Sequence, residues 1–162
     1  MWIVEKYVKY LIGFVLLWGG LYFYRSCGCQ KVVGSAMTPT FLSDEFLRVE
    51  VGKKRPGDVQ VKDLVWFWYQ SPTSKETGYL GRVIGLPGDR VTIKDGAVLV
   101  NGLPLAEEYM KEEFSKKEDL AEFIVPRDHF FILCDNRREP EPPDSRSFGP
   151  IPVSAVWGRV KR

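Results

Sequence analysis

The chain has 162 residues, with 23 Lys and Arg against 21 Asp and Glu, which gives a formal net charge of +2. This length suits one domain with its own hydrophobic core and excludes two domains of similar size. The near balance of charge argues against a nucleic-acid-binding protein that depends on a basic face. One His and three Cys are too few for most zinc modules, so we expect no metal site and no cofactor.

An uncharged apolar run, Tyr10 to Tyr24, lies between Lys9 and Arg25. As a helix it would cover roughly 22 Å, which is less than the bilayer core of about 30 Å, but Lys9 can snorkel and the aromatic residues suit an interfacial belt. A cleaved signal peptide and a buried core helix are the alternatives. A cleavable signal needs small residues before the cut, and the residues around Arg25 supply a poor site. We therefore predict an uncleaved membrane anchor over residues 1–25 and a second domain over residues 26–162.

The three cysteines, Cys27, Cys29 and Cys134, leave an odd thiol, so a disulfide framework is a poor interpretation. Cys27 and Cys29 are too close in an extended chain to bridge easily. Acylation beside the membrane is an alternative for this pair, whereas metal binding lacks a matching Cys pair or His.

The remainder of the chain has a β pattern. Short runs rich in β-branched and aromatic residues alternate with Pro-Gly, Asp-Gly and Asn-Gly turns, and Asp95-Gly96 predicts the tip of a hairpin. One charged segment, residues 107–122, has helical character and predicts a helix over the sheet. The predicted strands are 46–51, 63–69, 81–85, 90–94, 97–100 and 129–134. Within the second of these, the aromatic residues 66–69 fit either a core strand or a surface that dips into a membrane.

Three short signatures follow the anchor. The first is VVGSAMTPTF at residues 32–41, the second is GRVIGLPGD at residues 81–89, and the third joins DNR at 135–137 with DSR at 144–146. In this order, behind one N-terminal anchor, they closely resemble type I signal peptidases, the membrane-bound Ser/Lys proteases that remove signal peptides from exported proteins. The resemblance runs from about Val32 to Val160. It implies a mostly β fold, with a signal-peptidase-like antiparallel β domain behind one N-terminal transmembrane helix.

The residues that the resemblance assigns to catalysis are absent. Family members carry the nucleophilic Ser directly before the Met of the first signature, and here Ala36 precedes Met37. They carry a Lys, the general base, directly before the Arg of the second signature, and here Gly81 precedes Arg82. The Ser that orients this Lys falls in the interval between Arg137 and Asp144, which contains no hydroxyl. Ser35 is a weak alternative nucleophile, because in an extended segment its side chain would point away from that of Ala36. His129 does not match the motif of relatives that use His as the base.

The resemblance assigns other residues to the peptide cleft and to structure. Gly34, Met37 and Pro39 are candidates for the cleft. A polar network is expected to tie the sheet together, with an ion pair between Asp144 and Arg146. Its expected members are Arg82, Asp89, Asp135, Asn136, Asp144, Ser145 and Arg146.

Two hypotheses follow for function. In the first, the chain is a catalytically inactive signal peptidase homologue, anchored in membrane lipid with its β domain on the non-cytoplasmic side. It would serve as a binding or structural subunit for other membrane proteins or extended peptides. In the second, it is an active signal peptidase with a divergent nucleophile such as Ser35. If the fold is retained, Ala36 and Gly81 should meet on neighbouring strands, with Phe41, Tyr79 or Leu80 filling the space of the missing Lys.

Overall fold

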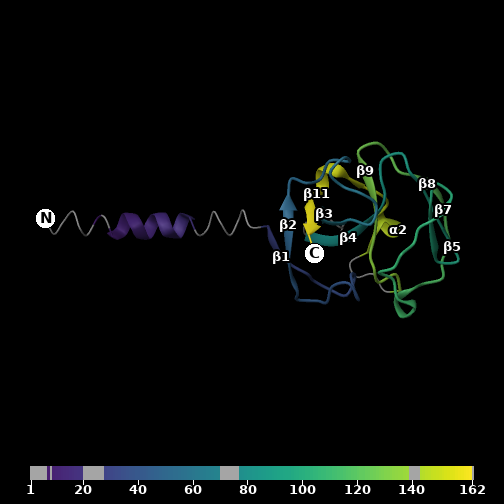
Figure 1. Ribbon diagram of the computed structural model, residues 1–162, viewed down its shortest axis with the longest axis horizontal. Coiled ribbons are helices and arrows are strands. Elements are labelled where there is room, and N and C mark those ends of the chain that lie inside the picture. The colour runs from purple at the N-terminus through teal and green to yellow at the C-terminus, as the bar shows by residue number, and fades with distance from the viewer. Residues whose placement is uncertain (1–6, 8, 20–27, 70–76, 139–142, 162) are drawn as a thin grey trace.

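The computed structural model describes residues 7, 9–19, 28–69, 77–138 and 143–161 (Figure 1). A helix covers residues 9–19, and the rings of Phe14 and Trp18 contact each other on it at 5.6 Å between centroids. None of the helices in these ranges combines the length and the apolar character that a membrane crossing requires. The transmembrane anchor stays a prediction, and its boundary with the β domain lies outside the described residues, as does Cys27.

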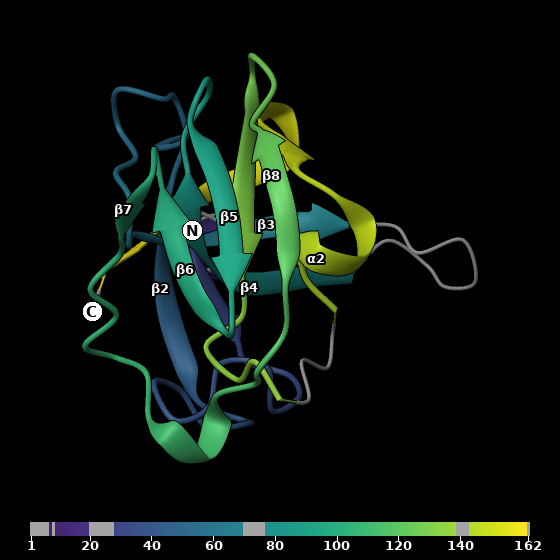
Figure 2. The same ribbon diagram turned by 90° about the vertical axis from the view of Figure 1, so that its right-hand side faces the viewer.

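The rest of the described chain is mostly β, as predicted, and forms two antiparallel sheets. The larger sheet has the order β1 (Cys29–Lys31), β2 (Phe46–Val51), β11 (Val156–Lys161), β3 (Leu64–Tyr69), β4 (Thr77–Gly85), β9 (His129–Leu133), β10 (Ile151–Pro152). The smaller sheet has the order β7 (Leu103–Pro104), β6 (Ala97–Val100), β5 (Arg90–Lys94), β8 (Leu120–Ile124). Figure 2 views the domain from the side of the smaller sheet, whose strands run across β3 and β4. Three short helices complete the fold: η1 (Glu112–Phe114), α2 (Ser145–Phe148) and η2 (Val153–Ala155).

The hairpin of β5 and β6 forms where the sequence predicts it. Lys94 pairs with Ala97, and Asp95 and Gly96 between them have φ angles of 48° and 83°. Positive φ at both central residues fits the right-handed twist of the paired strands, which explains the Asp-Gly sequence. The other predicted strands are also present, with β4 extended back to Thr77.

The predicted helix over residues 107–122 is wrong. Only η1 is helical in this segment. The last residues of the segment belong to strand β8, which pairs with β5. The charged pattern suggested a solvated face of a helix. Two of its carboxylates, Glu107 and Glu118, instead make salt bridges near the two ends of the segment. Tertiary contacts have overridden local propensity here.

Three apolar clusters form the core. The first packs residues 32, 36 and 37 against β2, β3 and β4, and it contains Trp66 and Leu80. The second uses the alternate positions of β3 and β4 together with residues of β9, and it contains Phe67 and Ile132. The third joins β4 and β9 to the smaller sheet. Trp66 and Phe67 are therefore core residues, whereas Trp68 is 38% exposed.

Candidate functional site

The first signature forms a turn that packs against the larger sheet. Residues 36–40 are in a hydrogen-bonded turn, where the Phe41 N–H donates to the carbonyl oxygen of Met37 at 2.9 Å. Ala36 and Met37 point into the core and are only 3% and 1% exposed. The expectation of an extended segment is therefore wrong at Ala36. Ser35 is nevertheless exposed where Ala36 is buried, so the two side chains have different surroundings.

The other cleft candidates flank this turn. Gly34 is half-buried and has a φ of 82°, a conformation that favours glycine. Pro39 is half-buried and follows a cis peptide bond with Thr38. Because Met37 is almost completely buried, its side chain serves as core packing in this structure.

Position 81 lies inside β4 and has no room for a side chain. A Cβ atom built on Gly81 would lie 2.4 Å from Ile132 Cγ2 and 3.2 Å from Phe67 Cε1. The first of these separations is shorter than any that van der Waals contact permits. The three nearest heavy atoms come from Ile132, Phe67 and Leu133. The space is thus filled, but by residues of β9 and β3 rather than by Phe41, Tyr79 or Leu80.

The fold brings the three signatures together. The Asn136 N–H donates to the carbonyl oxygen of Ala36 at 2.8 Å, and the Asn136 side-chain amide donates to that of Ser35 at 3.3 Å. Asn136 follows β9, which pairs with β4 through Arg82 and Leu133. The expectation that Ala36 and Gly81 meet on neighbouring strands is wrong, because Ala36 lies in a turn. Ala36 belongs to the core cluster of Trp66 and Leu80, whereas a Cβ atom at Gly81 would contact Ile132 and Phe67 of the second cluster.

A cavity of only about 10 Å³ remains beside Ala36. Its walls include Trp66, Gly78 and Leu80. Trp66 packs so closely on Gly78 that a Cβ there would lie 2.5 Å from the indole nitrogen. The smallest useful void holds about one water molecule, so a side chain from another peptide has no space here unless Trp66 moves.

Arg82 and Asp135 form a buried, two-pronged ion pair. Arg82 Nε donates to Asp135 Oδ1 at 2.8 Å and Nη2 donates to Oδ2 at 2.5 Å. The Thr40 hydroxyl donates to Asp135 Oδ2 at 2.5 Å, and the Arg82 guanidinium stacks 3.7 Å from the centre of the Tyr109 ring. Fork geometry of this kind fixes orientation as well as charge. It locks the turn after Ala36 against β4 and β9.

The third signature joins β9 to α2. Cys134 N–H donates to Asp144 Oδ2 at 2.9 Å, and Ile132 N–H donates to the Ser145 hydroxyl at 2.9 Å. Asp144 caps α2 and pairs with Arg146 at 2.8 Å, the ion pair that the sequence predicts. Asp89 serves a separate turn, where its carboxylate accepts from Leu86 N–H and from the Asn101 side chain at 2.8 Å each.

Two titratable side chains near the site, Cys134 and Tyr109, are perturbed by burial. Burial, reinforced by Asp144, raises the pKa of the Cys134 thiol well above its usual range. Burial and Glu107 likewise raise the pKa of Tyr109. His129 lies at the start of β9 with Nδ1 3.0 Å from the carbonyl oxygen of Arg127. Among the described residues no group of His, Cys, Asp or Glu could hold a metal ion.

Comparison with known proteins places this architecture. The profile of the family described as "Signal peptidase, peptidase S26" matches residues 4–162. The chain belongs to this signal peptidase family. It is 35% identical to signal peptidase I V of Bacillus subtilis (strain 168), over 80% of this chain and 81% of that protein. It is 36% identical to signal peptidase I P of Bacillus subtilis subsp. natto, over 66% of this chain and 60% of the relative's length. The crystal structure of a signal peptidase I from Enterococcus faecalis V583 superposes with a TM-score of 0.52 at 28% identity, covering 64% of this chain and 97% of that one.

Sequence reasoning missed a second group of polar residues around this S26 site. Arg137 donates to Glu107 and to the carbonyl oxygen of Cys134 at 2.5 and 2.6 Å, and Tyr109 donates to Glu107 at 2.5 Å. Arg146 pairs with Glu118 as well as with Asp144. These ion pairs attach the segment from Glu107 to Glu118 to the third signature. Its many charges gave no signal for this, because alternating Lys and Glu are typical of solvated surfaces.

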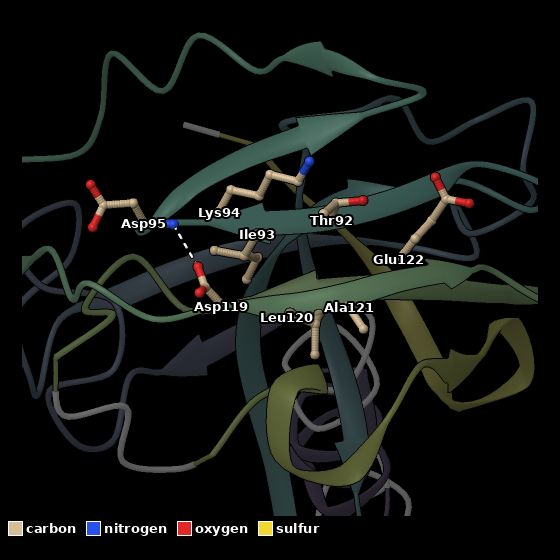
Figure 3. Close-up of a pocket in the computed structure, with 8 residues that line it drawn as sticks. All are labelled: Thr92, Ile93, Lys94, Asp95, Asp119, Leu120, Ala121 and Glu122. Atoms are coloured by element: carbon tan, nitrogen blue, oxygen red, sulfur yellow. Dashed lines mark hydrogen bonds between the residues drawn. The ribbon is translucent and has the colours of Figure 1, made fainter.

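A pocket much larger than the cavity beside Ala36 is lined by residues of β5 and β8. It has a volume of about 700 Å³ and opens on β5 and β8, where Asp95 N–H donates to Asp119 Oδ1 at 2.7 Å (Figure 3). It contains none of the residues of the three signatures. The volume of a pocket therefore does not by itself identify the region of the family's motifs in this chain.

Proposed function

We propose that this S26 family member is catalytically inactive and acts as a membrane-anchored binding or structural subunit. The observation that carries the proposal is the packing at Gly81, where Ile132 and Phe67 occupy the volume that a lysine stem needs. A recently lost lysine would leave a cavity. Closure of that cavity supports a core that is adapted to glycine.

The chemistry of peptide hydrolysis by a Ser/Lys dyad has no counterpart at these positions. The methyl group of Ala36 cannot form an acyl-enzyme, and Gly81 supplies no base to activate a nucleophile. Ser35 is exposed, and its carbonyl oxygen is held by Asn136. An exposed hydroxyl without a neighbouring base keeps its ordinary, unreactive pKa.

We place the β domain on the non-cytoplasmic side, behind a single anchor in residues 1–25, by analogy with the family. The partner that we favour is another membrane protein. The cavity of about 10 Å³ beside Ala36 supports a protein partner over an extended peptide whose side chains would enter that cavity. Membrane lipid is the expected surrounding of the anchor.

Incubation of the purified full chain with a preprotein tests the proposal. The protein is held in detergent micelles with a substrate that carries small residues before the cleavage site. The signal peptidase I V of Bacillus subtilis serves as the active control. We expect no cleavage by this chain. Cleavage at the expected bond that disappears with Ser35→Ala would establish the alternative, an active enzyme with a displaced nucleophile.

A second measurement addresses the partner. Mild detergent extraction of the native membrane followed by mass measurement of the intact complex should show a stoichiometric companion protein. A monomer that leaves the membrane alone would contradict the subunit role and leave the inactive fold without a binding function. Protease added to spheroplasts should digest the β domain, and protection would reverse the proposed topology.

A further inference from the structure

We propose that a pocket where β3 begins and β11 ends binds a phosphate-bearing anion. The pocket has a volume of about 340 Å³, and it shares no lining residue with the small cavity beside Ala36. It belongs to neither of the lost catalytic positions. The inference is independent of whether the chain hydrolyses peptides.

The pocket carries an excess of positive charge. Four cationic side chains line it, and Asp63 is the one carboxylate among its described lining residues. Two of the cations are neutralised. Arg82 pairs with the buried Asp135, and Arg159 is shared between Glu50 at 3.2 Å and Asp63 at 3.6 Å.

The other two cations, Lys62 and Lys161, lack such a partner. Within the described part of the chain, neither ammonium group has a carboxylate at salt-bridge distance. Asp63 attracts them weakly, because its carboxylate already accepts from Gln60 N–H at 2.9 Å and faces Arg159. Two unneutralised ammonium groups at the rim of one pocket attract an anion.

A third cation strengthens this field. Arg48 lies directly opposite Lys161 in the ladder between β2 and β11, and both side chains are exposed. Like charges directly opposite each other destabilise a sheet. Two residues along, the same ladder places Glu50 opposite Arg159, and these two form an ion pair. An anion bound near Lys161 would supply the missing negative charge.

The backbone that presents Lys62 is held rigidly. Its N–H donates to the carbonyl oxygen of Val83 at 2.8 Å, and its own carbonyl oxygen accepts from Arg82 Nη1 at 2.9 Å. The residue has a φ of 77°, so its conformation is fixed by these contacts and not by its own preference. Such pre-organisation reduces the ordering cost of binding.

The charge and the volume together identify the chemical class. A phosphate monoester carries about −1.5 to −2 charges at pH 7, which matches two free ammonium groups, whereas the phosphodiester of a lipid headgroup carries about −1 and would neutralise one of them. Lysine binds phosphate as a compact point charge with three N–H donors. The volume of about 340 Å³ leaves space for a small group attached to the phosphate. The source is either a free phosphate compound or the headgroup of an anionic lipid.

Titration of the isotope-labelled full chain in a neutral detergent tests the proposal. The probes are inorganic phosphate, glycerol 3-phosphate, dihexanoyl-phosphatidylglycerol and, as the zwitterionic control, dihexanoyl-phosphatidylcholine. Amide chemical shifts around Lys62 and Lys161 report binding. We expect saturable shifts with at least one of the three anionic probes and none with phosphatidylcholine.

A matched pair of variants separates a site from general charge. Lys62→Asn with Lys161→Gln removes both free cations, and Asn is chosen because it tolerates positive φ. Lys53→Gln with Lys94→Gln removes the same charge from positions outside the pocket. The first variant should weaken binding at least about tenfold and the second less than about twofold. Lys161→Gln alone should weaken binding severalfold, and it serves if the double variant fails to fold.

The outcomes decide the proposal and its source. Phosphatidylglycerol binding about tenfold more tightly than glycerol 3-phosphate would identify a lipid headgroup, and equal or weaker binding would identify a free phosphate compound. No saturable binding of any anionic probe would overturn the proposal. Equal loss of affinity in both double variants would overturn it as well, because general electrostatics would then account for the shifts.

Discussion

The polar half and the apolar half of the region around the family's motifs are built differently in this chain. Around Asp135, buried charges are retained and each has partners, among them Arg82 and the hydroxyl of Thr40. Around Gly81, the packing is tight and apolar and comes from Ile132 and Phe67. The difference teaches that the polar half holds the fold together. Removing one member of the polar half leaves a buried charge without its counter-ion. In the apolar half, a change of side-chain size is tolerated when neighbouring residues fill the volume.

Asp135→Ala should be the most destabilising test of this comparison. It leaves the Arg82 guanidinium, whose side chain is 8% exposed, buried without its counter-ion. The free energy of unfolding should fall by about 3 to 5 kcal/mol. Urea denaturation of the full chain in detergent, followed by circular dichroism, measures the change.

Asp44→Asn is the matched control for that variant, because Asn tolerates the positive φ of 73° at this position. Asp44 pairs with Lys31 at 2.7 Å, but both side chains are well exposed, so the loss should stay below about 1 kcal/mol. Equal losses in the two variants would show that the Asp135 pair does not hold the fold together.

Gly81→Lys should also destabilise the protein, because the new side chain must displace Ile132. Overpacking of this kind typically costs about 1 to 3 kcal/mol. Gly57→Lys is the control, since a Cβ at Gly57 meets no atom within 4 Å and should change stability by less than about 0.5 kcal/mol.

A double-mutant cycle sharpens the interpretation of position 81. In an Ile132→Ala background the penalty for Gly81→Lys should shrink, because the colliding methyl group is gone. An unchanged penalty would place the collision elsewhere and would weaken the argument that Ile132 has taken the place of the lysine.

Ala36→Ser restores a hydroxyl where family members have one, and it should restore no cleavage of a preprotein. The hydroxyl would be buried at a position that is 3% exposed and would have no base beside it. We expect a loss of about 1 to 3 kcal/mol in stability if the hydroxyl finds no partner. Cleavage by this single variant would mean that a base other than residue 81 is present.

The smallest effect that we predict concerns pH. Burial raises the pKa of the Cys134 thiol in the folded state, while the unfolded thiol keeps a pKa of about 8.5. The unfolded chain therefore loses protons first, and this contribution to stability is full below about pH 8.5 and declines as the pH rises beyond it. In Cys134→Ala, the fall in stability between pH 8 and 10 should be shallower, by up to about 1.4 kcal/mol per pH unit. Identical slopes would contradict the assignment of a buried neutral thiol.

The sequence by itself determined the features that depend on neighbouring residues. Asp95-Gly96 fixes the hairpin of β5 and β6, and the short β-branched runs fix most strands, because turn conformation and strand alternation are local properties. The order of the family motifs also predicted that Ala36 and Gly81 stand at the positions of the catalytic residues. The tertiary structure decided what local pattern could not. In place of the expected helix over residues 107–122 it gave a segment with salt bridges at Glu107 and Glu118, and it packed Ile132 against Gly81. Both outcomes depend on contacts between distant segments, and packing of that kind overrides local propensity.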